Sequence, residues 1–308
     1  MTLRQAQDGA PSEPPADPDA SAKDKALGWL RDHAFGLAIA NLIANIGIVV
    51  TGAVVRLTGS GLGCPTWPKC TEESYVTHEA LGINGVIEFG NRLLTYVLAA
   101  IAILVVVAVW KRGGTVRTLA IIIACGVPLQ GVIGGITVLT QLNPYVVALH
   151  LLASMGMVGL CVWLLDDLRS PRRAAAPRSV RIAAIVTFVL GWLTLWLGTV
   201  VTGSGPHSGD LDSRRTGLDP QLMSHIHAYA VYALVAATLV TLWLGRKHAY
   251  VRRVTIVLLV IELAQGLIGW VQYLTDLPVV LVGFHMLGAA LISAGIARVV
   301  CSVRARSV

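Results

Sequence analysis

Eight apolar segments, each long enough to cross a lipid bilayer, divide this chain of 308 residues. A helix needs roughly 20 apolar residues to span the hydrocarbon. Only 13% of the residues are charged, against about 25% in soluble domains. The sequence therefore predicts an all-α membrane protein with eight transmembrane helices. The expected spans cover about 35–56, 85–110, 118–139, 145–165, 181–202, 222–244, 254–274 and 279–298.

The charged residues are placed unevenly among the loops that join these segments. Basic residues cluster before the first segment and in every second loop after it, whereas the opposite loops carry few. By the positive-inside rule we expect both termini to be cytoplasmic, and an even number of spans agrees with this. The net charge of +7 therefore reflects membrane orientation, and we exclude nucleic-acid binding. The basic clusters contain Arg4, Lys23, Lys25 and Arg31; Lys111, Arg112 and Arg117; Arg169, Arg172, Arg173, Arg178 and Arg181; Arg246, Lys247, Arg252 and Arg253; and Arg298, Arg304 and Arg306.

One stretch of the chain occurs twice. The segments LQGVIGGITVLTQLNPYVVALHLL (129–152) and AQGLIGWVQYLTDLPVVLVGFHML (264–287) align without a gap. They share a Gln-Gly near the start and a His near the end, which is His150 in the first copy and His285 in the second. Each copy reads as an apolar helix, a short polar break and a second apolar helix. One His per copy predicts two related ligand sites in one membrane protein.

The rest of the chain extends this repeat. Gly52-Ala-Val-Val near the end of the first span matches Gly198-Thr-Val-Val in the fifth, and Asn91 in the second span falls on His227 in the sixth. Parallel repeats arise when each half has an even number of spans. We therefore expect two repeated four-helix bundles. The predicted parts are a disordered cytoplasmic tail at 1–26, an N-terminal half at 35–168, a cytoplasmic linker at 169–180, a C-terminal half at 181–300 and a cytoplasmic tail at 301–308.

Four histidines lie near the predicted outer ends of helices: His150, His225, His227 and His285. Ionisable groups at membrane depth are costly and mark functional sites, although a lone His near a helix end commonly bonds a neighbour instead. Zinc would need Cys or carboxylate partners, whereas two imidazoles from opposed helices suit a haem iron in a four-helix bundle. We expect His227 and His285 to hold one haem. His225 is the weaker candidate, because two residues along a helix point in different directions.

The N-terminal half lacks one of these ligands. Asn91 stands opposite His150, where the repeat calls for a second His, and Asn is a poor iron ligand. A haem iron with an open coordination position is typical of a haem that reacts, whereas a haem iron held between two histidines is typical of electron transfer. Glu88 lies on the same helix face as Asn91 and would move protons there. Its alternative role is a salt bridge to Arg92 or Arg56.

Two cysteines lie in the outer loop after the first span. Cys64 and Cys70 enclose a short stretch with two prolines, and the outer side is oxidising, so we expect a disulfide. In the loop-entropy model, closing so short a loop stabilises the folded state by about 2 kcal/mol. The sequence leaves open whether this pair is structural or redox-active.

Three polar residues stand inside apolar segments. Gln130 and Gln265, which are equivalent in the repeat, are expected to form hydrogen bonds across helices. Glu262 has Val127 as its equivalent, and the sequence assigns no role to it.

Taken in order, these motifs resemble the haem A synthase family over about residues 35–300. The resemblance implies a membrane enzyme that oxidises a methyl group of haem O to a formyl group by successive hydroxylations, which gives haem A for cytochrome oxidase. The motifs that carry it are Arg56-Leu-Thr-Gly-Ser-Gly61, the CPTWPKC loop at 64–70, Glu88-Phe-Gly-Asn91-Arg92, the QGVIGGITV run at 130–138, His150, TGSGPHSGD at 202–210, His227 and His285.

The resemblance also implies how the haems are held. The N-terminal half would bind the substrate haem, with His150 on its iron, and the C-terminal half would bind haem b between His227 and His285. Asn91 departs from the family, many members of which have His at this position. The departure leaves His150 as the one clear ligand of the substrate haem.

Further positions match residues around the substrate site. Glu88 matches the family's functionally important carboxylate and would be catalytic. Arg56 and Arg92 fall within motifs of the substrate haem site, and Cys64 and Cys70 match the outer-loop disulfide. The resemblance further implies a cell-membrane protein with haem sites toward the outer face, working with haem O synthase and the assembly of cytochrome oxidase. Membrane lipid is the remaining expected partner, and homo-oligomer formation is left open.

Two other classes of protein use similar features. A non-enzymatic diheme membrane cytochrome, exchanging electrons with quinone, would use the same histidines and leave the haem chemically unchanged. A transporter with duplicated halves would need broken helices near mid-membrane, whereas the polar groups here gather near the predicted outer face.

Overall fold

The computed structural model describes residues 18–306 except 170, 171, 208, 211 and 212. Every regular element of this described part is helical, apart from one isolated β-bridge between Arg173 and Arg306. The α-helices are α1 (Pro18–Asp32), α2 (Ala34–Leu57), α3 (Gly82–Val109), α4 (Gly114–Leu139), α5 (Pro144–Arg169), α6 (Arg178–Ser204), α7 (Pro220–Gly245), α8 (Ala249–Leu274) and α9 (Val279–Val303), and short 3₁₀ turns cover Glu79–Leu81 and Trp110–Arg112.

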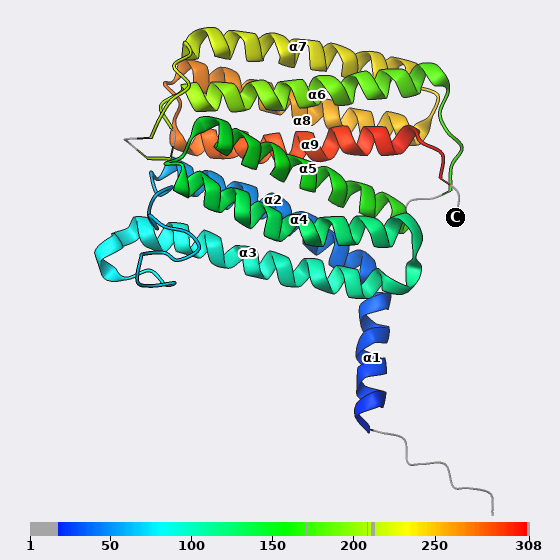
Figure 1. Ribbon diagram of the computed structural model, residues 1–308. Helices are drawn as coiled ribbons and strands as arrows, with labels where there is room; N and C mark the ends of the chain where they lie inside the picture. Colours follow the sequence, from blue (N-terminus) through cyan, green and yellow to red (C-terminus); the bar gives the residue numbers. More distant parts are fainter. Residues whose placement is uncertain (1–17, 170–171, 208, 211–212, 307–308) are drawn as a thin grey trace, which may run out of the picture.

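The long helices form two groups of four that lie side by side (Figure 1). Helix α2 packs on α3 and α5, and α4 packs on α3 and α5, so these four form a closed ring. Helices α6 to α9 form a second ring in the same order. The two groups meet where α5 and α2 contact α9 and where α5 contacts α6. The first and last described residues lie at the same end of the molecule (Figure 1).

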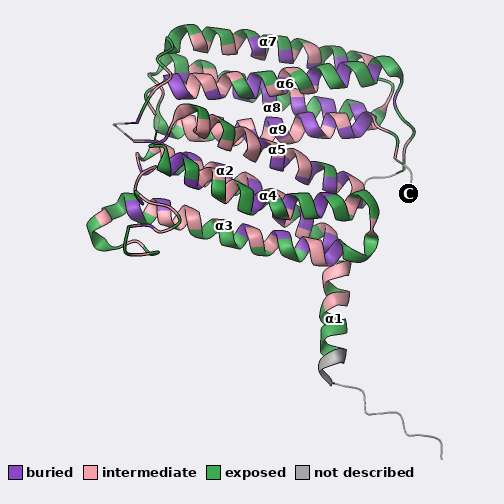
Figure 2. Ribbon diagram, in the orientation of Figure 1, coloured by how far each residue is buried: buried purple, intermediate pink, exposed green. Residues whose placement is uncertain are grey.

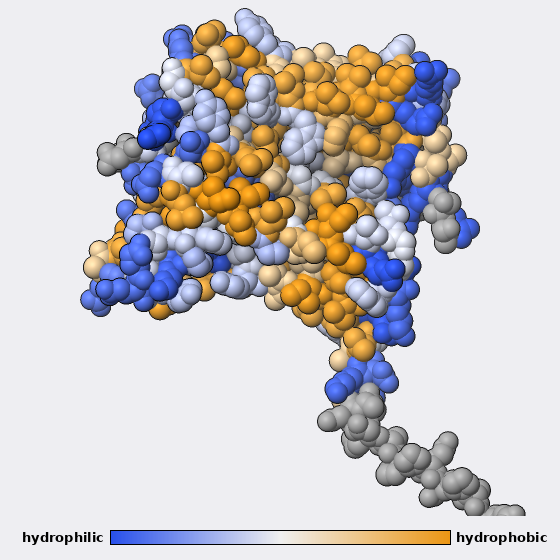
Figure 3. Space-filling view, in the orientation of Figure 1, coloured by the Kyte–Doolittle hydropathy of each residue, from blue (hydrophilic) through white to orange (hydrophobic). Residues whose placement is uncertain are grey.

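Eight of the described helices are long and apolar enough to cross a membrane, and α1 is the exception. Figure 3 shows the corresponding surface, on which hydrophobic residues cover the middle and hydrophilic residues gather at both ends of the helices. Buried residues run along the helices of both groups and alternate with exposed ones, as Figure 2 shows. This pattern is expected where lipid surrounds the helices, and the protein is a multi-pass membrane protein.

Apolar side chains form two cores, one in each group. The first surrounds Leu98, Val105, Ile123 and Leu164 on α3, α4 and α5. Buried residues of α6 to α9 form most of the second core, which also includes Val49 of α2 and Met155 of α5. The second core therefore reaches across the contact between the groups.

The two turns that join α4 to α5 and α8 to α9 have the same backbone form. Gln141 and Leu142 in the first turn, and Asp276 and Leu277 in the second, have φ between 54° and 57°. Such left-handed conformations are unfavourable for residues other than glycine. In both turns the leucine N–H donates to the carbonyl five residues before it, at 2.8 Å and 3.0 Å. The repeated sequence thus produces the same hairpin twice.

The structure differs from the sequence prediction at both ends. Residues 1–17 of the predicted tail at 1–26 lie outside the described residues, but Pro18–Asp32 are helical because Ala, Lys and Leu favour helix and Pro18 suits its first turn. Helix α9 continues to Val303, into the predicted tail at 301–308. Residues 301–303 are buried, and Arg304 and Arg306 bond to α5, so this segment packs on the protein. Residues 170–171 of the linker, residue 208 of the TGSGPHSGD motif and residues 307–308 are not described.

Candidate haem sites at one end of the two bundles

Two imidazoles of the C-terminal group lie on glycine residues of the preceding helices. A Cβ added to Gly198 of α6 would stand 3.3 Å from Cε1 of His227 on α7. A Cβ added to Gly269 of α8 would stand 3.3 Å from Cε1 of His285 on α9. Because glycine has no side chain, each ring can approach the neighbouring backbone closely. His227 and His285 are near enough to interact electrostatically.

The nitrogen atoms of these rings fit ligation of a haem iron. Nδ1 of His227 and Nδ1 of His285 are buried and form no hydrogen bond with a described residue. The backbone carbonyl of Thr194 lies near the His227 ring but accepts no hydrogen bond from it. Imidazoles that hold a metal commonly direct their second nitrogen toward a backbone carbonyl. Two rings from the opposed helices α7 and α9 are a donor set that suits haem iron.

His225, the weaker candidate ligand, points elsewhere. Its side chain is exposed, and its Nε2 lies 3.3 Å from the hydroxyl of Tyr273 on α8. The ring centroids of His225 and Tyr273 are 5.8 Å apart. His225 is thus placed against the outside of α8, whereas His227 faces α6.

One imidazole of the N-terminal group repeats this arrangement. A Cβ added to Gly134 of α4 would stand 3.4 Å from Cε1 of His150 on α5, and Nδ1 of His150 is buried without a described partner. Gln130 donates to the carbonyl of His150 at 3.2 Å and to the hydroxyl of Ser154 at 2.7 Å.

The matching glutamine, Gln265, acts in the same way in the second group. It donates to the carbonyl of His285 at 2.6 Å. The prediction that both glutamines form hydrogen bonds across helices is therefore confirmed. Each glutamine fixes the helix turn that carries a histidine.

Asn91 does not reproduce the contact that His227 makes. The Oδ1 atom of Asn91 on α3 accepts a hydrogen bond from the hydroxyl of Thr51 on α2 at 2.7 Å. Gly52, which corresponds to Gly198 in the repeat, has no described atom within 4 Å of an added Cβ. The N-terminal group therefore has one imidazole seated on glycine where the C-terminal group has two.

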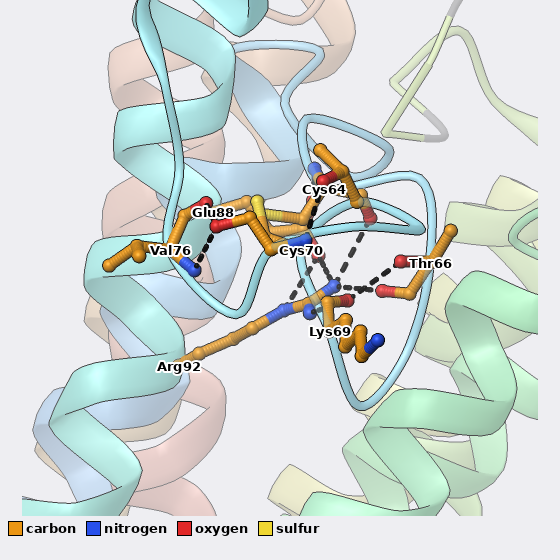
Figure 4. Close-up of a disulfide and its surroundings, with 9 residues drawn as sticks. Cys64, Thr66, Lys69, Cys70, Val76, Glu88 and Arg92 are labelled. Atoms are coloured by element: carbon orange, nitrogen blue, oxygen red, sulfur yellow. Dashed lines mark hydrogen bonds and ion pairs between the residues drawn. A yellow bond between two sulfur atoms is a disulfide. The ribbon is translucent and has the colours of Figure 1, made fainter.

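Glu88 is buried beneath the cysteine loop (Figure 4). Its Oε1 is 2.6 Å from Nη2 of Arg92, one turn further along α3. Its Oε2 accepts a hydrogen bond from the backbone N–H of Cys64. Of the two salt-bridge partners considered from the sequence, Arg92 makes the contact.

The cysteine loop is fixed to α3 by the same arginine. Cys64 and Cys70 form the predicted disulfide, and both residues are fully buried. Arg92 also donates to the carbonyls of Cys64 at 3.1 Å, Thr66 at 3.0 Å and Lys69 at 3.1 Å. Figure 4 shows its guanidinium reaching into the loop below the disulfide. Glu88 and Arg92 thus hold the loop in one position.

The loop also lies against α4 beside the glycine that supports His150. A Cβ added to Gly135 would collide with the ring of Trp67, which lies between the two cysteines. Because Gly135 follows Gly134, the loop is next to the His150 site. It covers the end of the N-terminal group that carries this imidazole.

Arg56 connects the two groups. Its Nη2 donates to the carbonyl of Thr202 at 2.7 Å, and its Nε donates to the carbonyl of His207. Both acceptors belong to the end of α6 or the loop after it. The described hydrogen bonds of Arg56 therefore lead to the C-terminal group, and those of Arg92 lead to the cysteine loop.

Sequence reasoning did not identify the glycine residues beneath the imidazoles. A signal for two of them was present, because Gly134 and Gly269 are identical positions of the repeat. The hydrogen bond between Thr51 and Asn91, and the contact of Trp67 with Gly135, had no such signal.

Comparisons with known proteins agree with these features. A sequence model of the family COX15-CtaA, described as cytochrome oxidase assembly protein, matches residues 36–206. A protein named Heme A synthase from Methylorubrum extorquens is 31% identical over 196 residues, which cover 52% of this chain and 51% of that protein. Another from Methylobacterium radiotolerans is 29% identical over 239 residues, which cover 66% and 63%.

A more distant relative is matched over a larger share of both chains. The Heme A synthase of Halalkalibacterium halodurans is 26% identical over 269 residues, which cover 80% of this chain and 88% of that protein. The chain spans about half the length of the Methylorubrum relatives that it matches.

Proposed function

The chain belongs to the COX15-CtaA family of cytochrome oxidase assembly proteins, and from this premise we propose that it is a haem A synthase. The proposed reaction oxidises a methyl group of haem O to a formyl group by successive hydroxylations, with electrons leaving the site. The product, haem A, would serve the assembly of cytochrome oxidase. Relatives named Heme A synthase support this proposal.

The asymmetry between the two groups of helices carries the proposal. The C-terminal group offers two imidazoles on glycine, His227 and His285, whereas the N-terminal group offers only His150 and uses Asn91 to bond Thr51. A closed bis-His site suits electron transfer, and a site with one axial imidazole suits a substrate haem that must react and leave. A simple diheme cytochrome would have no need for this difference.

The C-terminal group is the proposed haem b site. His227 and His285 would hold the haem iron, with Gly198 beneath the first ring and Gln265 fixing the turn that carries the second. Haem b bound there would supply one-electron transfer. The glycine residues beneath the rings would keep both imidazoles in place.

The N-terminal group is the proposed substrate site. His150 would bind the iron of haem O, and Gln130 would hold its helix turn. Oxidation of the methyl group releases protons, and the carboxylate of Glu88 would accept them when it exchanges a hydrogen bond from Arg92 or Cys64. The cysteine loop, with Trp67 against Gly135, would keep water from the site.

We also propose that the two groups are duplicated halves that share an orientation. The matching hairpins, the paired glutamines and the repeated contacts between glycine and imidazole support a duplication. The basic loops support cytoplasmic termini in the cell membrane, which would direct both haem sites to the outer face. Haem O synthase would be the source of the substrate.

Extraction of haems from the purified protein tests the proposal. The protein would be produced with and without a source of haem O, and its haems would be separated by chromatography. We expect haem b alone without that source, and haem O or haem A in addition when the source is present. Haem b alone under both conditions would instead favour a diheme cytochrome, and no haem at all would contradict both functions.

A pair of histidine variants tests the site assignment. In His150→Ala we expect haem A to fall to background while haem b stays bound, because the C-terminal imidazoles are intact. The matched control is His225→Ala, which removes an imidazole that faces Tyr273 and should leave haem A at the normal level. Normal haem A production in His150→Ala would show that the assignment is wrong.

A further inference from the structure

A large groove lies between the two groups of helices, and one end of it reaches Gln130, which bonds the helix turn of His150. Its volume is about 750 Å³, and its walls come from α4, α5, α6 and α9. Small residues form much of it, including Gly126, Ala153, Gly156 and Gly159. The volume falls within the range of sites that hold small molecules, about 300–1,000 Å³.

The groove runs along membrane-spanning segments. One end lies at Gln130 and Ile133 of α4, and the other lies at Cys301 and Arg304, where α9 ends. Its lining is almost wholly apolar, so an occupant must itself be apolar over most of its length. Lipid chains surround such segments in a bilayer, and they satisfy this condition.

The end of the groove at Arg304 is positively charged. Arg173, Arg298 and Arg304 surround the fully buried Asp166 at 2.6, 2.8 and 2.9 Å. Arg304 also pairs with Asp167, whose backbone carbonyl accepts a hydrogen bond from Arg306. Among the described residues of this cluster, four arginines therefore face two aspartates, an excess of two positive charges.

Several hydrogen-bond donors in this cluster have no acceptor among the described residues. Nε of Arg304, Nη1 of Arg173 and Nη1 of Arg306 are buried and donate to no described residue. The guanidinium of Arg304 stacks on Trp163, another residue of the groove wall, with 5.0 Å between the guanidinium carbon and the ring centre. Buried donors without acceptors are unfavourable, and an anionic group in the groove would accept from Nε of Arg304, which belongs to the groove lining.

From this combination we propose that the groove binds an anionic phospholipid, with an acyl chain between the two groups of helices and the phosphate at Arg304. Basic pockets between transmembrane helices on the cytoplasmic side bind anionic headgroups, and the positive loops assign this end to that side. The lipid would fill the contact between the halves and neutralise the excess charge beside Asp166.

Native mass spectrometry of the full chain, released from nanodiscs of phosphatidylglycerol and phosphatidylcholine, tests this proposal. We expect one phosphatidylglycerol to remain bound per chain. Arg304→Gln should weaken its retention about fivefold, which is the effect of one basic residue near a membrane surface. The matched control is Arg246→Gln, because Arg246 also stacks on a tryptophan at this end of the molecule but lies outside the groove.

A second set of variants fills the groove. Ala153→Phe and Cys125→Phe should displace the phosphatidylglycerol, whereas Ala100→Phe on the exposed face of α3 should not. The unfolding midpoint and the elution volume in gel filtration show whether each variant is folded, and neither measurement depends on the proposed enzymatic function. The proposal would be overturned if the wild type retained both lipids equally, retained no lipid, or retained an isoprenoid in place of the phospholipid. It would also be overturned if Ala153→Phe and Cys125→Phe retained as much phosphatidylglycerol as the wild type.

Discussion

Each candidate ligand is placed by a glycine on the helix that precedes it in the chain. Gly134 supports His150, Gly198 supports His227 and Gly269 supports His285, at 3.3–3.4 Å between the ring and an added Cβ. At Gly198 and Gly269 an added methyl group would require the imidazole to shift by a few tenths of an ångström, whereas at Gly134 it would meet the ring at the limit of ordinary van der Waals contact. At Gly52 this contact is missing, because the facing residue is the shorter Asn91, which bonds Thr51 instead.

The substitution Asn91→His tests this asymmetry. The new imidazole would extend into the space beside Gly52 and oppose His150, as His227 opposes His285. We expect the variant to retain a second haem b without a source of haem O and to lose haem A production. The measurement is haem content per chain with an absorption spectrum of the reduced protein. Asn91→Gln is the control, since its amide has no imidazole nitrogen, and it should retain one haem b. If Asn91→His also retains one, its side chain does not face the iron position.

At the scale of elements, local pattern and long-range contact differ in how far sequence predicts them. The eight spans were predicted closely because apolar runs of this length have few alternatives in a membrane. The end of α9 was predicted too early, since Arg298 resembled the start of a basic tail. In the structure Arg298 is paired with the buried Asp166, and this partner is 132 residues away.

The candidate site shows the same division. The repeat predicted His150 and His285 as candidate ligands, because their identical spacing is visible in the sequence, and its alignment of Asn91 with His227 added His227. It could not identify the carbonyl partners of Arg56 and Arg92, which belong to the end of α6 and to the cysteine loop. A carbonyl has no residue-type signature, so only the folded path of the loop reveals these contacts.

The cysteine loop depends on the shape of one side chain. Arg92 bonds Glu88 and three loop carbonyls, and a lysine keeps the charge but cannot present this planar set of donors. We expect Arg92→Lys to lower the free energy of unfolding by about 2 kcal/mol, since two or more hydrogen bonds are lost. Denaturant titration followed by tryptophan fluorescence measures this. Arg117→Lys, at an exposed arginine over Trp110, should change the value by less than about 0.5 kcal/mol.

At the scale of the whole molecule, the two groups of helices are joined at both ends. Arg56 bonds the end of α6 on the side of the candidate haem sites. On the other side Asp166 of α5 binds three arginines, two of which belong to α9 and the segment after it. The groove lies between these two sets of contacts.

Asp166→Asn should weaken the ion pairs that hold α5 to α9 at this end of the molecule. The substitution leaves three arginines beside a neutral amide, and removing one partner of a buried ion pair costs about 3–5 kcal/mol. We expect a lower unfolding midpoint and faster tryptic cleavage after Arg172 and Arg173, in the linker between α5 and α6. Asp32→Asn, at an exposed carboxylate of α1, is the control and should leave both measurements unchanged. Unchanged cleavage in Asp166→Asn would mean that the arginines do not hold the halves together.

The pairing of Arg306 with Arg173 has a consequence for biosynthesis. Their backbones exchange hydrogen bonds of 2.9 Å and 3.3 Å, and Arg304 reaches Asp166 from the same segment. These contacts cannot form until residue 306 has left the ribosome. During translation the first four spans therefore enter the membrane before Arg298 and Arg304 can reach Asp166, whereas Arg173, seven residues after Asp166, is already present. The order of synthesis therefore places these contacts after the synthesis of all eight spans.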